Sequence, residues 1–237
     1  MVLYQLDTTR IIQVYILQGT VGFFFLFLAY RILKRDTKRL NLMLSLGYIT
    51  ASIGIFINFI YAPLTNEAIV LVLYYMTIFF MFLFAAFFLV FLLILLKSEK
   101  VFTPKKQLVL IIIYGVAELC SFFIPNGVII NASTDWKPVW SWFMFIYFVT
   151  VIVSLGMAPS LYISSKIYQQ FDDDQLKRKW KFFIVGICGI YTFAIGTLLS
   201  NTLNIQTFRT IWSLFAFILV IISPLLIYYG VGRQIEK

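Results

Sequence analysis

The stretch "AIVLVLYYMTIFFMFLFAAFFLVFLLILL", residues 68–96, contains no charged residue. A helix needs roughly 20 apolar residues to cross the hydrocarbon core of a membrane, so this run is long enough to span it with some tilt. The whole chain is 62% hydrophobic and only 12% charged, whereas soluble domains are about half apolar and a quarter charged. We therefore expect a helical, multi-pass membrane protein.

Six further apolar runs flank this one along the chain. The predicted spans lie near residues 11–33, 41–62, 68–96, 108–126, 139–164, 180–203 and 208–230. Together they predict an all-α bundle of seven transmembrane helices, which forms a single domain over residues 1–237.

The basic residues predict how the bundle is oriented. All but three of the 19 lysines and arginines lie beside the same ends of the spans or in the tail, and the exceptions are Arg10, Lys137 and Arg209. By the positive-inside rule, the N-terminus is outside the cell membrane and the C-terminus is cytoplasmic. Because these charges sit beside apolar runs, we expect the basic rim to bind anionic lipid headgroups and not nucleic acid.

Five tryptophans fall near the ends of predicted spans. An indole ring favours the membrane interface because the ring is apolar and its N–H seeks water. The sequence therefore predicts an aromatic belt that consists of Trp136, Trp140, Trp142 and Trp212 outside and Trp180 inside.

One acidic residue lies deep within a predicted span, in the stretch "YGVAELCSFF" at residues 114–123. Glu118 is about ten residues into the fourth span, which corresponds to a depth of roughly 15 Å, near the midplane. A carboxylate there is costly unless it is protonated, paired or beside water. Its helical neighbours Tyr114, Gly115 and Ser121 make this face more polar than the rest of the helix, so we expect Glu118 to face the bundle.

Other spans carry polar residues at helical spacing, mostly in the outer half of the membrane. They either join helices by hydrogen bonds worth about 0.6 to 2 kcal/mol each, or they line a cavity open to the outside with Glu118 as its floor. In the second case the predicted ligand-binding residues are Glu118, Asn58, Asn201, Gln18, Ser154, Tyr114 and Thr197.

The composition argues against catalysis. The chain contains no histidine, which removes serine and cysteine triads, histidine-ligated metals and haem. A lone acid such as Glu118 is a weak basis for proton-transfer chemistry. We therefore expect no enzyme, metal or cofactor. We expect no retinal either, because microbial rhodopsins bind it through a lysine in the last helix and residues 208–230 contain none.

The segment "IIYGVAELCSFF" at residues 112–123 is followed by "TDWKPVWSW" at residues 134–142. With its short outer loops and basic inner loops, the whole chain resembles the seven-transmembrane sensor region of some prokaryotic histidine kinases. It also resembles uncharacterised stand-alone seven-helix membrane proteins of archaeal type. In the kinases the seventh helix leads into a signalling domain, whereas here "YYGVGRQIEK" follows. The resemblance therefore implies a sensor whose output passes through a separate cytoplasmic partner.

These observations predict a receptor-like membrane sensor that binds a small or lipid-like ligand in an outward-facing cavity between its helices. Glu118 would be a neutral hydrogen-bond donor, or the counter-charge of a cationic ligand. Two alternatives stay open. In a small-molecule transporter the same cavity would also open inward, and in a structural or assembly subunit the polar residues would only join helices.

Overall fold

The structure is a computed structural model that describes residues 8–232, and 84% of it is helical. Within this range, seven helical spans are long and apolar enough to cross a membrane. They are Ile12–Arg35, Arg39–Tyr61, Glu67–Lys97, Pro104–Phe123, Trp142–Gln169, Asp174–Leu203 and Gln206–Val231. The prediction of an all-α, seven-helix, multi-pass membrane protein is therefore confirmed.

The spans are built in three ways. The second, sixth and seventh are single helices, namely α3 (Arg39–Tyr61), α9 (Asp174–Leu203) and α10 (Gln206–Gly232). The third joins α4 (Glu67–Phe82) to α5 (Phe84–Lys97), and the fourth joins α6 (Pro104–Leu119) to the 3-10 turn η2 (Cys120–Phe123). The first and fifth contain π-helical segments: η1 (Ile12–Gln18) between α1 (Thr8–Ile11) and α2 (Gly19–Arg35), and η4 (Ile152–Met157) between α7 (Trp142–Val151) and α8 (Ala158–Gln169).

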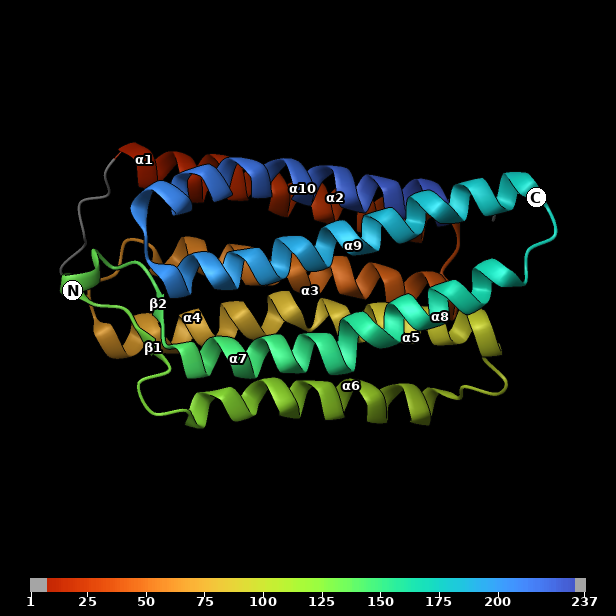
Figure 1. Cartoon of the computed structure of the whole chain (residues 1–237), viewed down its shortest axis with the longest axis horizontal. Helices are drawn as coiled ribbons and strands as arrows, with labels where there is room; N and C mark the ends of the chain where they lie inside the picture. The colour runs from red at the N-terminus through yellow and green to blue at the C-terminus, as the bar shows by residue number, and fades with distance from the viewer. Residues whose placement is uncertain (1–7, 233–237) are drawn as a thin grey trace.

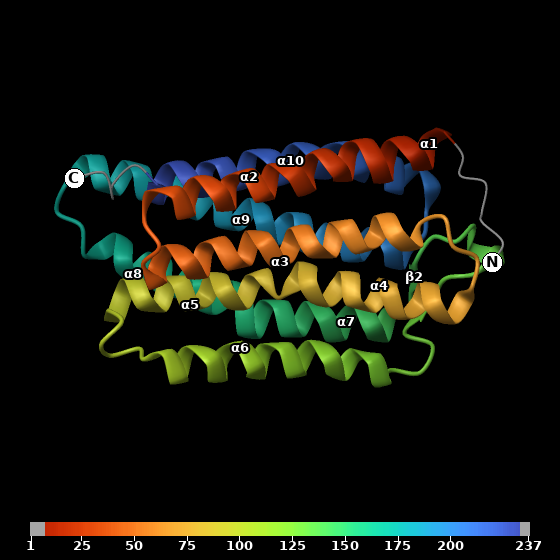
Figure 2. The same cartoon turned by 180° about the vertical axis from the view of Figure 1, so that it is seen from behind.

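The two ends of the bundle differ in structure and charge (Figure 1, and Figure 2 from behind). The hairpin end carries the link from η2 to α7, which contains the antiparallel strands β1 (Val128–Ile129) and β2 (Val139–Trp140) and the 3-10 helix η3 (Ala132–Thr134). The basic end carries the lysine- and arginine-rich links that follow α2, α5 and α8. Helix α1 begins at the hairpin end and α10 ends at the basic end.

Glycines let neighbouring helices approach closely at two places. A Cβ atom on Gly186 of α9 would lie 2.7 Å from the carbonyl oxygen of Ser223 on α10. A Cβ atom on Gly54 of α3 would lie 2.7 Å from the carbonyl oxygen of Thr77 on α4. Side-chain carbons essentially never come this close to another atom, so both positions require glycine. Small residues at such contacts are typical of membrane helix pairs.

The tryptophans divide between the core and the surface. Trp142 is 56% exposed, as an aromatic belt requires. Trp140 and Trp180 are buried instead, and each indole N–H has a partner: Trp140 Nε1 donates to the hydroxyl of Tyr74 at 2.6 Å, and Trp180 Nε1 donates to the carbonyl of Ser164 at 2.8 Å. Trp136 is buried as well. The predicted belt is therefore wrong for these three residues, and for Trp140 and Trp180 partners inside the bundle replace water at the interface.

Two arginines, one just before the first span and one in the last span, contact the link at the hairpin end. Arg10 donates to the carbonyls of Asp135 at 2.9 Å and Trp136 at 3.0 Å, and Arg209 donates to the carbonyl of Pro138 at 2.6 Å. Asp135 and Trp136 have φ angles of 50° and 56°, a region that residues other than glycine rarely adopt. We call residues 128–140 with these two arginines the clamped cap. It covers the end of the bundle from which the sequence predicted ligand access.

Candidate functional site on helix α6

Helix α6 lies at one edge of the bundle in both views (Figure 1 and Figure 2). Only 28% of the most apolar stretch of its span is buried, compared with 61% for α3. One side of α6 is apolar and exposed, as at Leu108 and Ile112. The other side is buried, and it carries Gln107, Tyr114, Gly115 and Glu118. Their spacing of seven, eight and eleven residues from Gln107 places them on one helix face.

Glu118 is buried without a partner for its carboxyl group. It is 1% exposed, and neither carboxyl oxygen accepts or donates a hydrogen bond within residues 8–232. The nearby hydroxyl of Ser121 donates to the backbone carbonyl of Glu118 at 2.6 Å, not to the carboxyl group. Buried polar atoms without partners are rare in native proteins, and each one calls for an explanation.

The depth of Glu118 differs from the prediction. The fourth span begins at Pro104 and not near residue 108. Glu118 therefore lies roughly 21 Å along this span, between its middle and its hairpin end. The difference arises because the polar turn at 104–107 is helical, which hydropathy alone does not reveal.

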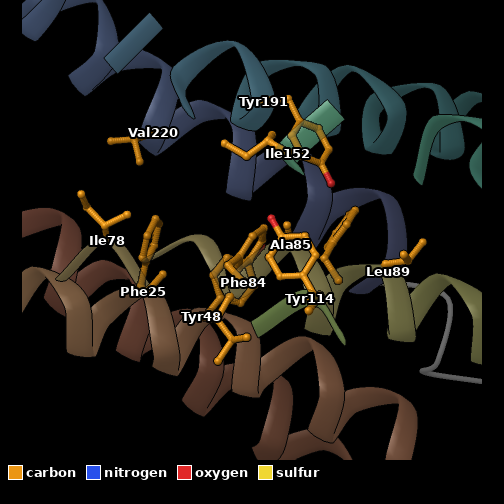
Figure 3. Close-up of a cluster of buried hydrophobic side chains, with 14 of the residues drawn as sticks. Phe25, Tyr48, Ile78, Phe84, Ala85, Leu89, Tyr114, Ile152, Tyr191 and Val220 are labelled. Carbon is orange, nitrogen blue, oxygen red and sulfur yellow. The ribbon is translucent and has the colours of Figure 1, made fainter. Parts of the chain in front are cut away.

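Tyr114 repeats this pattern one turn before Glu118. The side chain is 1% exposed, and its hydroxyl has no hydrogen-bond partner in the described part of the chain. Tyr191 of α9 reaches into the same cluster of side chains (Figure 3), and its hydroxyl lies 3.3 Å from the hydroxyl of Ser160. Tyr114 and Glu118 are thus two unpartnered polar side chains on one face of α6, and we call them the α6 polar pair.

A groove of about 290 Å³ runs along α6 and includes Tyr114 in its lining. Helix α6 forms one wall, and η4 with the first turn of α8 forms the opposite wall. The lining residues include Leu89, Lys106, Val109, Tyr114, Ser154 and Pro159. Because Val109 is 55% exposed, the groove opens on the lateral surface of the bundle. Its volume is at the lower limit of small-ligand pockets, which span about 300 to 1,000 Å³.

A smaller cavity of about 50 Å³ lies in the centre of the bundle. Its lining is almost wholly apolar, and Figure 3 shows several of these residues, including Phe25, Phe84, Ala85, Ile152 and Val220. A cavity without polar partners stays dry. It is therefore a poor site for a ligand that must be held by hydrogen bonds.

Three of the predicted ligand-binding residues join helices. Asn58 of α3 donates its side-chain amide to Oε1 of Gln18 in η1. The hydroxyl of Thr197 in α9 accepts from Nε1 of Trp212 in α10 at 3.2 Å and donates to a carbonyl in its own helix. These residues therefore fit the helix-joining interpretation.

The last two predicted residues lie in different surroundings. Ser154 lines the α6 groove, and its hydroxyl donates to the carbonyl of Thr150 at 2.6 Å. Asn201 lies at the clamped cap, where its carbonyl accepts from Arg209 at 3.4 Å. Tyr114 and Ser154 thus line the α6 groove, and Glu118 lies one turn beyond Tyr114 on the same helix face. The structure does not bring Gln18, Asn58, Thr197 or Asn201 to them.

Three basic residues that the sequence indicated only as markers of topology have further contacts in the structure. Arg10 and Arg209 hold the clamped cap. They are two of the few cations at the hairpin end, and a cation on that side of a span indicates a structural role. Lys106 lines the α6 groove. The sequence did not single out Lys106 as a groove residue, because it is one lysine within a basic cluster.

Residues 8–232 contain no group of three or more histidine, cysteine, aspartate or glutamate side chains that is placed to hold a metal ion. No protein-family model, curated protein or solved structure matches this chain. Its function is therefore argued from the α6 polar pair and the α6 groove.

Proposed function

We propose that this chain is a receptor-like sensor of the cell membrane, which binds a small, lipid-like ligand and signals through a separate cytoplasmic partner. The lysines and arginines at the basic end support placing that end in the cytoplasm and the hairpin end outside. The same charges suit anionic lipid headgroups. The resemblance of the segment around Glu118 to the sensor regions of prokaryotic histidine kinases supports a sensing role.

The observation that carries this proposal is the α6 polar pair. Leaving a buried polar group without a partner costs about 1 to 3 kcal/mol, and ionisable residues inside a membrane are functional by default. Gln18, Asn58 and Thr197, in contrast, have partners across helix contacts. A ligand that hydrogen-bonds to Glu118 and Tyr114 would supply the partners that the protein itself does not provide.

We infer that the ligand enters laterally from the membrane and not through the outward-facing cavity that the sequence predicted. The clamped cap covers the hairpin end, whereas the α6 groove reaches Tyr114 from the outer surface of the bundle. A molecule that enters through this groove must first dissolve in the bilayer. The route therefore favours a lipid-like ligand over a water-soluble one.

A movement of α6 would carry the signal to the cytoplasm. Helix α6 is one of the two least buried spans, and the facing wall contains the π-helix η4 followed by Pro159. π-helical segments are frequent at functional sites, and proline weakens the local helix. Binding at the polar pair would draw α6 toward α7 and α8, and this would shift the links at the basic end.

Native mass spectrometry of gently extracted protein tests the proposal. We expect a co-purified small molecule or lipid on the wild type that is lost in Glu118→Gln. The matched control is Glu67→Gln, which makes the same chemical change at an exposed glutamate in the first turn of α4. The control should retain the adduct. A wild type that carries no adduct, or an adduct that survives in Glu118→Gln, would contradict the proposal.

The same samples separate the sensor from the two alternatives. A transporter would move the bound molecule across proteoliposomes, whereas a sensor binds it without flux. An assembly subunit would co-purify with a second membrane protein and carry no small-molecule adduct. Either result would replace the sensor proposal.

A further inference from the structure

We propose that the α6 groove binds one chain of a hydroxylated fatty acid, with the carboxylate at Lys106 and the hydroxyl group at Tyr114. This inference rests on the proposed function and names its ligand class. It depends on a cation at one end of the groove, an apolar wall along its length and, further in, Tyr114, whose buried hydroxyl has no partner within residues 8–232.

The cation defines the head of the ligand. Lys106 lies in the first turn of α6, at the basic end, and it lines the groove. Its Nζ lies 3.2 Å from the carbonyl oxygen of Val101, so the ammonium group is directed toward the link at that end. A lysine at this depth can reach the headgroup region of the bilayer. A single positive charge there matches a single carboxylate.

The wall defines the body of the ligand. Between Lys106 and Tyr114 the α6 side of the groove presents Val109, Leu110 and Ile113. Only apolar side chains stand in this interval on α6, and the hydroxyl of Ser154 on the facing wall donates to the carbonyl of Thr150, so the middle of the ligand is hydrocarbon. At about 290 Å³ the groove is small for a drug-sized ligand, and we therefore assign it one acyl chain.

The unpartnered hydroxyl defines a polar group far along the chain. A plain hydrocarbon tail would supply no partner for the Tyr114 hydroxyl, which has none within residues 8–232. A hydroxyl on the ligand would both donate to and accept from Tyr114. Glu118 lies one turn further along the same face, where the bound hydroxyl and Tyr114 would bring it into the same hydrogen-bond network.

The geometry sets the position of that hydroxyl. Lys106 and Tyr114 are eight positions apart, which is about 12 Å along a helix. Bond lengths and angles give an extended hydrocarbon chain an advance of roughly 1.25 Å per carbon, so this separation corresponds to roughly ten carbons. Because Lys106 points toward the basic end, the hydroxyl belongs roughly ten to fourteen carbons from the carboxylate.

Binding titrations on the full chain in neutral-phospholipid nanodiscs test this inference. The probes are 12-hydroxyoctadecanoic acid, 2-hydroxyoctadecanoic acid and octadecanoic acid. We expect the wild type to prefer the 12-hydroxy acid over the other two by about three- to tenfold. Tyr114→Phe should abolish this preference. Lys106→Gln should weaken binding of all three acids by about fivefold, whereas Lys105→Gln, at the exposed neighbouring lysine, should not.

Two results would overturn the inference: equal affinity for the three acids, or equal effects of Lys106→Gln and Lys105→Gln. Thermal unfolding of each variant checks that it is folded. If no acid binds but an adduct that depends on Glu118 is still detected by mass spectrometry, the ligand class is wrong and the sensor proposal stands. If the adduct is absent too, both are wrong.

Discussion

The hydroxyl of Tyr147 donates a hydrogen bond of 2.6 Å to the backbone carbonyl of Ala117, the residue immediately before Glu118. This bond holds α6 against α7 through its backbone, and the adjacent carboxyl group has no hydrogen-bond partner among the residues that the structure describes. The protein thus contains a donor from a neighbouring helix at this level, yet it does not use that donor to satisfy Glu118. This arrangement favours a ligand-binding role over a helix-joining role, and it leads to opposite stability effects for the two classes of polar residue.

We expect Glu118→Leu to stabilise the ligand-free protein, because replacing an unpartnered buried polar group removes about 1 to 3 kcal/mol of desolvation cost. Asn58→Leu should destabilise it by about 0.6 to 2 kcal/mol, because Gln18 loses its partner. For a chain of this length, melting temperature shifts by about 2 to 4 °C per kcal/mol. Thermal unfolding in detergent measures both. If Glu118→Leu lowered the melting temperature as much as Asn58→Leu does, Glu118 would have a role in helix packing and not in ligand binding.

Gly186→Ala should lower the melting temperature, because the new methyl group would meet the backbone of α10 at 2.7 Å. Overpacking of this kind costs about 1 to 3 kcal/mol. Gly115→Ala is the matched control, since its Cβ would meet the ring of Phe79 at 3.5 Å and Leu83 at 3.8 Å, both ordinary contacts. We expect the control to unfold at the wild-type temperature or up to about 4 °C above it, because alanine favours a helix over glycine by up to about 1 kcal/mol. If both variants lowered the melting temperature equally, α9 and α10 would not be packed backbone to backbone at this point.

Arg209→Ala should open the clamped cap, since it removes the donor to the carbonyl of Pro138. Hydrogen exchange measured by mass spectrometry should rise across residues 128–140, while exchange in α9 and α10 changes little. Lys137→Ala, which removes a charge from the same link, is the control. Arg209→Lys should rescue the cap only in part, because lysine lacks the planar fork of donors. Unchanged exchange in Arg209→Ala would show that the arginine is dispensable for the cap.

The proposed orientation predicts which side of the membrane each end faces. In a chain with Cys120→Ser and Cys188→Ser, which removes both free cysteines, a membrane-impermeant thiol reagent applied to intact cells should label Ser133→Cys. It should not label Lys100→Cys until the cells are opened. The two positions are exposed at the hairpin end and the basic end, respectively. The reverse labelling pattern would show that the protein has the opposite orientation in the membrane.

The architecture could be predicted from the sequence because hydropathy depends on local composition. A run such as residues 68–96 must be a membrane helix whatever its neighbours are. Helix periodicity also predicted that Glu118 and Tyr114 share one buried face, and both are 1% exposed.

Contacts between distant segments could not be predicted in this way. Periodicity indicates which face of a helix is polar, but it does not indicate which helix lies opposite. The pairing of Asn58 with Gln18 and the burial of Trp180 against Ser164 follow from the packing of distant segments. The π-helix η4 also has no signature in the hydropathy, although it forms one wall of the groove.

The clamped cap has a consequence for how the chain is made. It joins Arg10, which precedes the first span, to a link more than a hundred residues later, and it also requires Arg209 from the seventh span. Contacts between such distant segments form late, because the intervening chain must be ordered first. During synthesis the cap therefore stays incomplete until the last helix has entered the bilayer. A truncated or misinserted chain would expose an unfinished hairpin end, which distinguishes it from a correctly folded chain.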